Sequence, residues 1–124
     1  MSYIYLASPY THTNGAVRYN RYIAVRDELV SMTLRGDTVY SPIVNWHEVT
    51  RTYDLPHDWR WWQHHNETML KQASFLRVLC LPGYNESQGV QHEIDYATNV
   101  LKIPVQHYMP ESSSPALKEL EHAT

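Results

Sequence analysis

The sequence is poor in the features that cross-link a protein, bind a metal or enter a membrane. It has 124 residues and one cysteine, Cys80, which lies in an apolar run. We therefore expect a reduced core thiol rather than half of a disulfide. No spacing of cysteines and histidines is typical of a zinc site, and no apolar stretch approaches the roughly 18 residues that span a bilayer. The sequence thus predicts no metal, no cofactor and no membrane segment.

Positive charge is also scarce. Ten Lys and Arg residues stand against 13 Asp and Glu residues, which gives a formal net charge of -3. This balance provides no broad basic surface for a nucleic-acid backbone, so a nucleic-acid polymer is not an expected partner. Met1 leads directly into a strand-like segment with no cationic and apolar leader before it, and we expect a cytoplasmic protein.

Short apolar runs alternate with helical periodicities, over a length that fits one domain. Strands are expected at residues 3–7, 38–40, 75–81 and 104–108, and helices at 16–35, 59–72 and 87–101. A strand, a helix and a second strand at this spacing form a right-handed βαβ unit. The pattern therefore predicts an α/β fold, a doubly wound parallel sheet with helices on both faces.

Two segments have weaker patterns. Residues 43–57 show no sustained period, so we expect a loop there with room for one helical turn. The predicted domain covers residues 1–110, and a C-terminal tail follows at 111–124. The stretch 116–121 in this tail favours a helix, and the sequence leaves open whether that end is mobile or docks on a partner subunit.

The most informative motif is Ser87-Gln88-Gly89-Val90-Gln91-His92-Glu93, which follows the third apolar run and a Pro82-Gly83 turn. The order indicates a buried strand, a loop and a helix start, and parallel sheets bind ligands at this edge. Glu93 borders the apolar stripe of the helix, which makes it a candidate nucleophile or general base. Tyr5, at the end of the first strand, is the phenol best placed to reach it. A solvated glutamate and a core tyrosine are the alternatives.

Further candidates for ligand binding have equally ordinary explanations. Ser87 and Gly89 suit an anion site at a helix start, but they also suit a helix cap and a tight turn. Arg18 and Arg21 follow the first strand, and either they supply positive charge at the same sheet edge or they face solvent. Trp46, Trp59 and their tryptophan neighbours suit stacking on a planar base, core packing or a subunit interface. His64 and His65 are weaker candidates for a proton donor.

Three groups of residues together resemble the nucleoside 2-deoxyribosyltransferase superfamily. They are Ile4-Tyr5-Leu6-Ala7-Ser8-Pro9-Tyr10, then Ser41-Pro42, then Ser87-x-Gly89-x-x-x-Glu93 with Tyr96-Ala97. The likeness spans about residues 3–108. The turn Leu81-Pro82-Gly83-Tyr84 is similar to that of a small bacterial and phage branch. The resemblance implies a flavodoxin-like sheet, a homodimer or larger homo-oligomer, and cleavage of the N-glycosidic bond of a nucleoside or nucleotide.

The resemblance also implies roles for single residues. The glutamate that matches Glu93 attacks the anomeric carbon, and the tyrosine that matches Tyr5 positions it. Members that act on free nucleosides tend to carry an aspartate six residues before the glutamate, whereas nucleotide N-hydrolases carry a serine, as Ser87 does here. An aspartate would repel a phosphate. The expected function is therefore N-glycosidic cleavage of a (deoxy)nucleoside 5′-monophosphate with release of free base. A deoxyribosyltransferase and a nucleotide-binding module without turnover are the alternatives.

One expected residue is missing. Many relatives carry an aspartate shortly before the third strand that addresses or protonates the base, and the nearest residues here are Asn66 and Ser74. Asn66 can hydrogen-bond a base but cannot act as an acid. Protonation of the base is then left to His64, His65, Asp58 or solvent.

Overall fold

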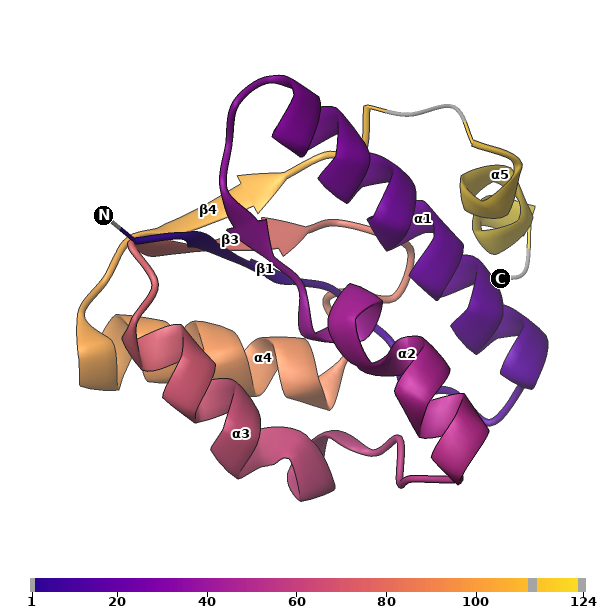
Figure 1. The fold of residues 1–124 in the computed structure, drawn as a ribbon, viewed down its shortest axis with the longest axis horizontal. Helices are drawn as coiled ribbons and strands as arrows, with labels where there is room; N and C mark the ends of the chain where they lie inside the picture. The colour runs from indigo at the N-terminus through magenta and orange to yellow at the C-terminus, as the bar shows by residue number, and fades with distance from the viewer. Residues whose placement is uncertain (1, 112–113, 123–124) are drawn as a thin grey trace.

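The computed structural model describes residues 2–111 and 114–122. Four parallel strands form one sheet in the order β2-β1-β3-β4, with helices on both faces (Figure 1). The strands are β1 (Ile4–Ala7), β2 (Val39–Tyr40), β3 (Phe75–Leu79) and β4 (Val105–Tyr108). The helices are α1 (Gly15–Leu34), α2 (Pro42–Tyr53), α3 (Trp59–Lys71), α4 (Gln88–Asp95) and α5 (Pro115–His122), and a π-helical segment, η1 (Tyr96–Leu101), continues α4. The predicted α/β fold is confirmed.

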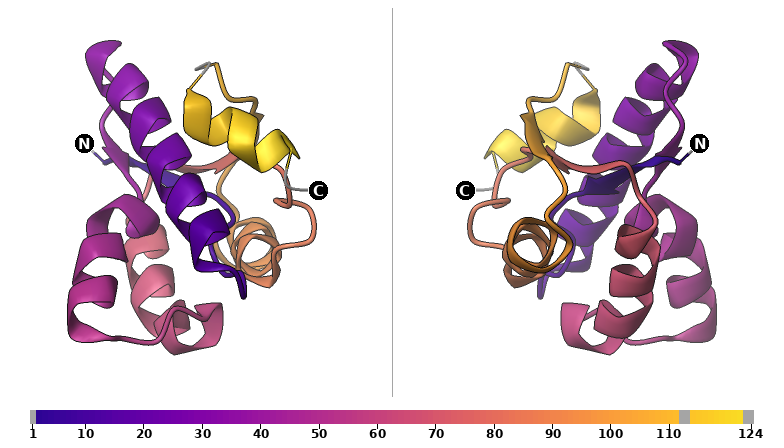
Figure 2. Two further views of the ribbon diagram at one scale, coloured as in Figure 1. Left: turned by 90° about the vertical axis from the view of Figure 1, so that its right-hand side faces the viewer. Right: turned by 90° about the vertical axis from the view of Figure 1, so that its left-hand side faces the viewer.

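The strand side chains alternate between two hydrophobic clusters, as the period of two in a strand requires. Tyr5, Leu76 and Val78 belong to the cluster that α3 and α4 cover. Leu6 and Leu79 belong to the cluster on the opposite face, which α1 and α5 cover. Figure 2 shows these two helical layers on either side of the sheet. The motif from Ser87 to Glu93 therefore lies on the same face of the sheet as the Tyr5 side chain.

Residues 43–57 do not form the predicted loop, because α2 occupies most of this segment. The Ser41 side chain accepts a hydrogen bond from the Val44 amide at 3.1 Å, and Pro42 takes the first helical position, where its missing N–H costs nothing. Asp54 ends the helix in the left-handed conformation, with φ 54°. The signals for this helix lie at its ends and not in its apolar period, which is why periodicity missed it.

The C-terminal helix α5 packs on α1. Leu117 and Leu120 of α5 are buried in the cluster on the α1 face. The helix expected at 116–121 therefore exists as α5, and within the described residues it packs on α1. Residues 112–113 and 123–124 of the expected tail lie outside the described residues.

Two elements differ from expectation by more than one residue at an end. β3 ends at Leu79, two residues before the predicted end of the strand. The helix expected at 87–101 is α-helical only to Asp95, and from Tyr96 to Leu101 it is π-helical. The π-helical segment begins directly after α4 and includes Tyr96 and Ala97, which belong to the motifs named in the sequence analysis.

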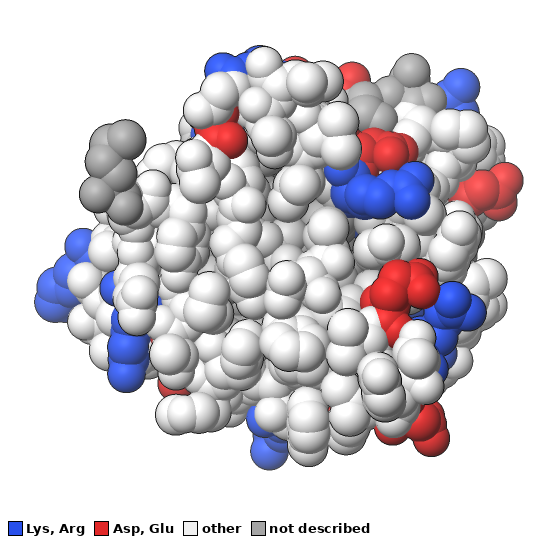
Figure 3. Space-filling model, in the orientation of Figure 1, with Lys and Arg blue, Asp and Glu red and all other residues white. Residues whose placement is uncertain are grey.

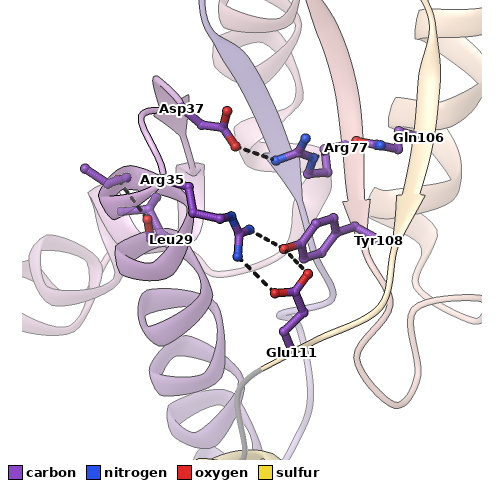
Figure 4. A network of polar contacts seen from close by, with 8 residues as sticks. Leu29, Arg35, Asp37, Arg77, Gln106, Tyr108 and Glu111 are labelled. Carbon is purple, nitrogen blue, oxygen red and sulfur yellow. Dashed lines mark hydrogen bonds and ion pairs between the residues drawn. The ribbon is translucent and has the colours of Figure 1, made fainter.

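Charges on the α1 face of the sheet are paired with one another (Figure 4). Arg77 of β3 binds Asp37 at 3.2 Å and the Gln106 side chain at 2.7 Å. Arg35, which follows α1, binds Glu111 at 2.9 Å, and the Tyr108 hydroxyl donates to the same carboxylate at 2.9 Å. This network ties the end of α1 to β3, β4 and the segment after β4.

The surface in the orientation of Figure 1 has a broad uncharged area in its middle (Figure 3). Lys and Arg side chains alternate with Asp and Glu side chains around its margins. This face therefore presents no continuous basic surface of the kind that a nucleic-acid backbone requires. Within residues 2–111 and 114–122, no helix has both the length and the apolar character to cross a membrane.

Candidate functional site

A cavity of about 330 Å³ lies beyond the carboxyl ends of the strands. The segments that follow β1, β2 and β3 all contribute to its walls, together with the facing sides of α2, α3 and α4. This is the edge at which open parallel sheets bind ligands, and the volume falls within the roughly 300–1,000 Å³ common for small-molecule sites. The cavity is therefore the candidate functional site.

Glu93 and Tyr5 meet at this cavity. The Tyr5 hydroxyl donates a hydrogen bond to the Glu93 carboxylate, which confirms the expected contact across the sheet edge. Tyr5 is fully buried, and Glu93 lines the cavity. Burial raises the pKa of Glu93 to about 7, although the Tyr5 hydrogen bond opposes the rise. Burial and the nearby carboxylate raise the pKa of Tyr5 well above its usual value, so the phenol stays a donor.

The start of α4 brings Ser87 and Gly89 to the cavity wall. The Ser87 hydroxyl caps the helix by accepting a hydrogen bond from the Val90 amide at 3.3 Å. A Cβ at position 89 would lie 3.0 Å from the Cβ of Trp59, so glycine lets α3 and α4 approach closely. Both residues thus have a structural use and a place at the site.

The two candidate arginines differ in position. Arg21 is buried, donates to the Thr11 carbonyl at 2.9 Å and lines a second cavity, which Ser87 also lines. Burial lowers the pKa of its guanidinium. Arg18 is not among the residues that line either cavity, and its guanidinium binds the His12 carbonyl instead. Of the two, Arg21 is the one that lines a cavity together with the start of α4.

The residues expected to bind a base all line the cavity: Trp46, Trp59 and Asn66. The Asn66 Oδ1 atom is buried without a hydrogen-bond partner in the part of the chain that the structure describes. The same holds for Ser8 Oγ and His47 Nε2, whose residues also line the cavity. Buried polar atoms are usually hydrogen-bonded, and each orphan costs about 1–3 kcal/mol, so this wall is suited to a polar ligand.

Sequence reasoning missed a second polar pair at the site, Glu67 and His92. Both residues line the cavity, and His92 Nε2 lies 2.6 Å from Glu67 Oε2. The Gln63 side chain donates to the same oxygen at 3.0 Å. Burial alone would raise the pKa of Glu67, but the hydrogen bonds from His92 and Gln63, together with charge interactions with His92 and Lys71, lower it. The available signal was the position of His92 directly before Glu93.

The proton donors suggested by the sequence lie elsewhere. His64 is exposed, and Asp58 is the N-cap of α3. The Trp46 indole donates to His65 Nε2 at 3.3 Å, and His65 is not among the residues that line the cavity. Within the described residues, no group of three or more His, Cys, Asp or Glu side chains is arranged to hold a metal ion.

Fold and site together define an α/β protein with a carboxylate and a phenol paired at the ligand-binding edge of a parallel sheet. A family model, the domain of unknown function DUF1937, matches residues 2–109. Because the match covers most of the sequence, the chain belongs to this family. No curated protein matches the sequence.

Proposed function

We propose that this protein cleaves the N-glycosidic bond of a (deoxy)nucleoside 5′-monophosphate, with Glu93 as the nucleophile. The observation that carries the proposal is the Glu93 carboxylate, which lines the cavity and is hydrogen-bonded to the buried Tyr5 hydroxyl. With a pKa of about 7, Glu93 is substantially ionised at neutral pH. A desolvated carboxylate held by one donor is suited to attack an electron-poor carbon.

The proposed reaction follows the logic of retaining glycosidases. A Glu93 oxygen attacks C1′ of the sugar while the bond from C1′ to the base breaks, and its electron pair leaves with the base. The Tyr5 hydroxyl donates a hydrogen bond to the other carboxylate oxygen of Glu93 and fixes the orientation of the carboxylate. Water then attacks C1′ of the glycosyl ester, which releases the sugar phosphate and frees Glu93.

The proposed orientation of the nucleotide follows from the polar groups around Glu93. The base lies against Trp59 and Trp46, where an aromatic face gains from stacking, and the Asn66 amide binds its edge. The phosphate lies at the start of α4 beside Ser87, where the helix dipole favours an anion and Arg21 adds positive charge nearby. The unpartnered Asn66 Oδ1 and Ser8 Oγ atoms support a polar ligand.

The direct test is to incubate the protein with each common nucleoside, ribonucleoside monophosphate and deoxynucleoside monophosphate and to separate free base by chromatography. We expect base from monophosphates only. Transfer of the sugar to an added second base would identify a transferase. Tight binding of a nucleotide with no base released would contradict catalysis and favour a binding module. The homo-oligomer that the resemblance implies stays a prediction, which sedimentation equilibrium would test.

A further inference from the structure

The pair formed by His92 and Glu67 lies beside the nucleophile but has no part in the reaction as described so far. Glu67 holds Nε2 of the imidazole, and Gln63 holds Glu67 in place. No described residue forms a hydrogen bond with Nδ1 of His92. When the ring is protonated, the Nε2–H group donates a hydrogen bond to the Glu67 carboxylate and the Nδ1–H group is available to a ligand.

Two aromatic rings pack beside the His92 ring and restrict its orientation. The Trp59 ring lies 5.0 Å away at an interplanar angle of 31°, and the Tyr96 ring lies 6.2 Å away at 23°.

His92 and Glu93 are consecutive on α4, so their side chains leave the helix in directions about 100° apart. Glu93 turns toward Tyr5 of the sheet, and His92 turns toward Glu67 of α3, yet both line one cavity. If C1′ of a nucleotide is placed at Glu93, the base extends along α3, where Asn66 and Trp59 also lie. That position brings the edge of the base to His92.

We infer that His92 is the catalytic acid that protonates the departing base, that Glu67 is its positioning residue, and that the substrate is a purine nucleotide. The inference rests on the proposed function. A purine offers N7, on the edge of the ring away from the sugar, as the atom to be protonated. As the bond from C1′ to N9 breaks, the electron pair enters the ring and the Nδ1 proton moves to N7. Neutral His92 then accepts a proton from the water that attacks the glycosyl ester, which restores the imidazolium.

The other histidines at the cavity are less suited to this step. His47 is buried, its Nδ1 is engaged with the Tyr10 hydroxyl at 2.7 Å, and burial lowers its pKa, so it stays neutral. His57 is exposed, and no carboxylate among the described residues holds its ring. Only His92 combines a carboxylate partner, an available nitrogen and a position next to Glu93.

The test compares two substrates, deoxyguanosine 5′-monophosphate and its N7-methylated form. The methylated base already carries positive charge and leaves without an acid. We expect His92→Gln to slow base release from the ordinary nucleotide by roughly 10²-fold or more, the usual contribution of a general acid, and to slow release from the methylated one less than about threefold. Glu67→Gln should show the same selectivity with a smaller loss in kcat at unchanged KM, and Glu67→Asp should restore part of the rate.

The outcomes separate the inference from the proposed function. If His92→Gln slows both substrates equally while the variant melts at the wild-type temperature, His92 is not the acid and the inference is wrong. If the wild-type protein releases base only from pyrimidine nucleotides, the inference is also wrong although the proposed function stands. If the wild-type protein releases base from no nucleotide, the proposed function fails, and the inference fails with it.

Discussion

Two pairs of a tyrosine and a glutamate lie on opposite faces of the sheet, and their surroundings differ. Tyr108 donates to Glu111 at the surface, and Arg35 binds the same carboxylate at 2.9 Å (Figure 4). Tyr5 donates to Glu93 inside the protein, and no cation among the described residues pairs with that carboxylate. On one face of the sheet, the charge of the glutamate is therefore balanced by an arginine. On the other face, the glutamate has a tyrosine as its hydrogen-bond donor and no countercharge among the described residues.

The surroundings of the two carboxylates indicate which of them serves function. A carboxylate that serves stability gains from a countercharge, as Glu111 does. Glu93 lacks one, and burial raises its pKa to about 7, so its ionisation costs free energy in the folded state. A fold retains such a group at a cavity where chemistry needs it, and perturbed acids cluster at functional sites for this reason.

The largest expected effect comes from removing the inner carboxylate. Glu93→Gln leaves the shape and the Tyr5 contact but removes the nucleophile, so we expect base release to fall by roughly 10⁴-fold, as for the loss of other nucleophiles. Nucleotide affinity should stay within about tenfold, which corresponds to roughly 1.4 kcal/mol. Chromatographic rate measurement and calorimetric titration check the two parts. A variant with wild-type turnover would exclude Glu93 as the nucleophile.

A matched pair of variants tests the phenols next. Tyr5→Phe removes the hydrogen bond that lowers the pKa of Glu93, so the pKa should rise above about 7. Because the ionised carboxylate is the reactive form, the rise of activity with pH should move to higher pH, with a loss of roughly tenfold at neutral pH for one pKa unit. Tyr108→Phe, the same change on the other face, should leave the pH profile unchanged. Equal profiles for both variants would contradict the role of Tyr5.

The pH dependence of stability provides a third comparison. The folded-state pKa of Glu93 lies above its ordinary value of 4.5, so the folded protein holds this proton more tightly than the unfolded chain does. The free energy of unfolding should therefore fall as pH rises from about 4.5 to about 7. Glu93→Gln should remove this fall and gain on the order of 2 kcal/mol relative to wild type above pH 7. Urea denaturation at several pH values measures it, and parallel curves for the two proteins would contradict the raised pKa.

The smallest effect is expected from the outer pair. Arg35→Ala removes an exposed ion pair, so it should lower the free energy of unfolding only slightly and leave base release unchanged. Thermal melting and the chromatographic assay check both statements. A large loss of activity would mean that the two faces are coupled and that the comparison does not hold.

The sequence allowed the sheet, the helix at Ser87 and the contact between Tyr5 and Glu93 to be predicted, because each depends on a local pattern and on which strand end faces which loop. It did not allow α2 to be predicted, since that helix is specified by Ser41, Pro42 and Asp54 at its ends rather than by an apolar period.

The contact between Glu67 and His92 could not be predicted from the sequence for a different reason. The two residues are 25 positions apart on two helices, and their contact depends on how closely α3 packs against α4. No local pattern of residues encodes that distance. The same holds for α5, whose docking on α1 depends on tertiary packing of Leu117 and Leu120.

Gly89 lies where α3 and α4 pack against each other, and its lack of a side chain allows their close approach. A methyl group at this position would meet the Cβ of Trp59 at 3.0 Å, and the helices would have to separate by a few tenths of an ångström. His92 lies one turn further along the same side of α4 and reaches toward α3 for its 2.6 Å bond to Glu67. The distance between α3 and α4 thus depends on the missing side chain of Gly89. The length of the hydrogen bond between His92 and Glu67 depends on that same distance.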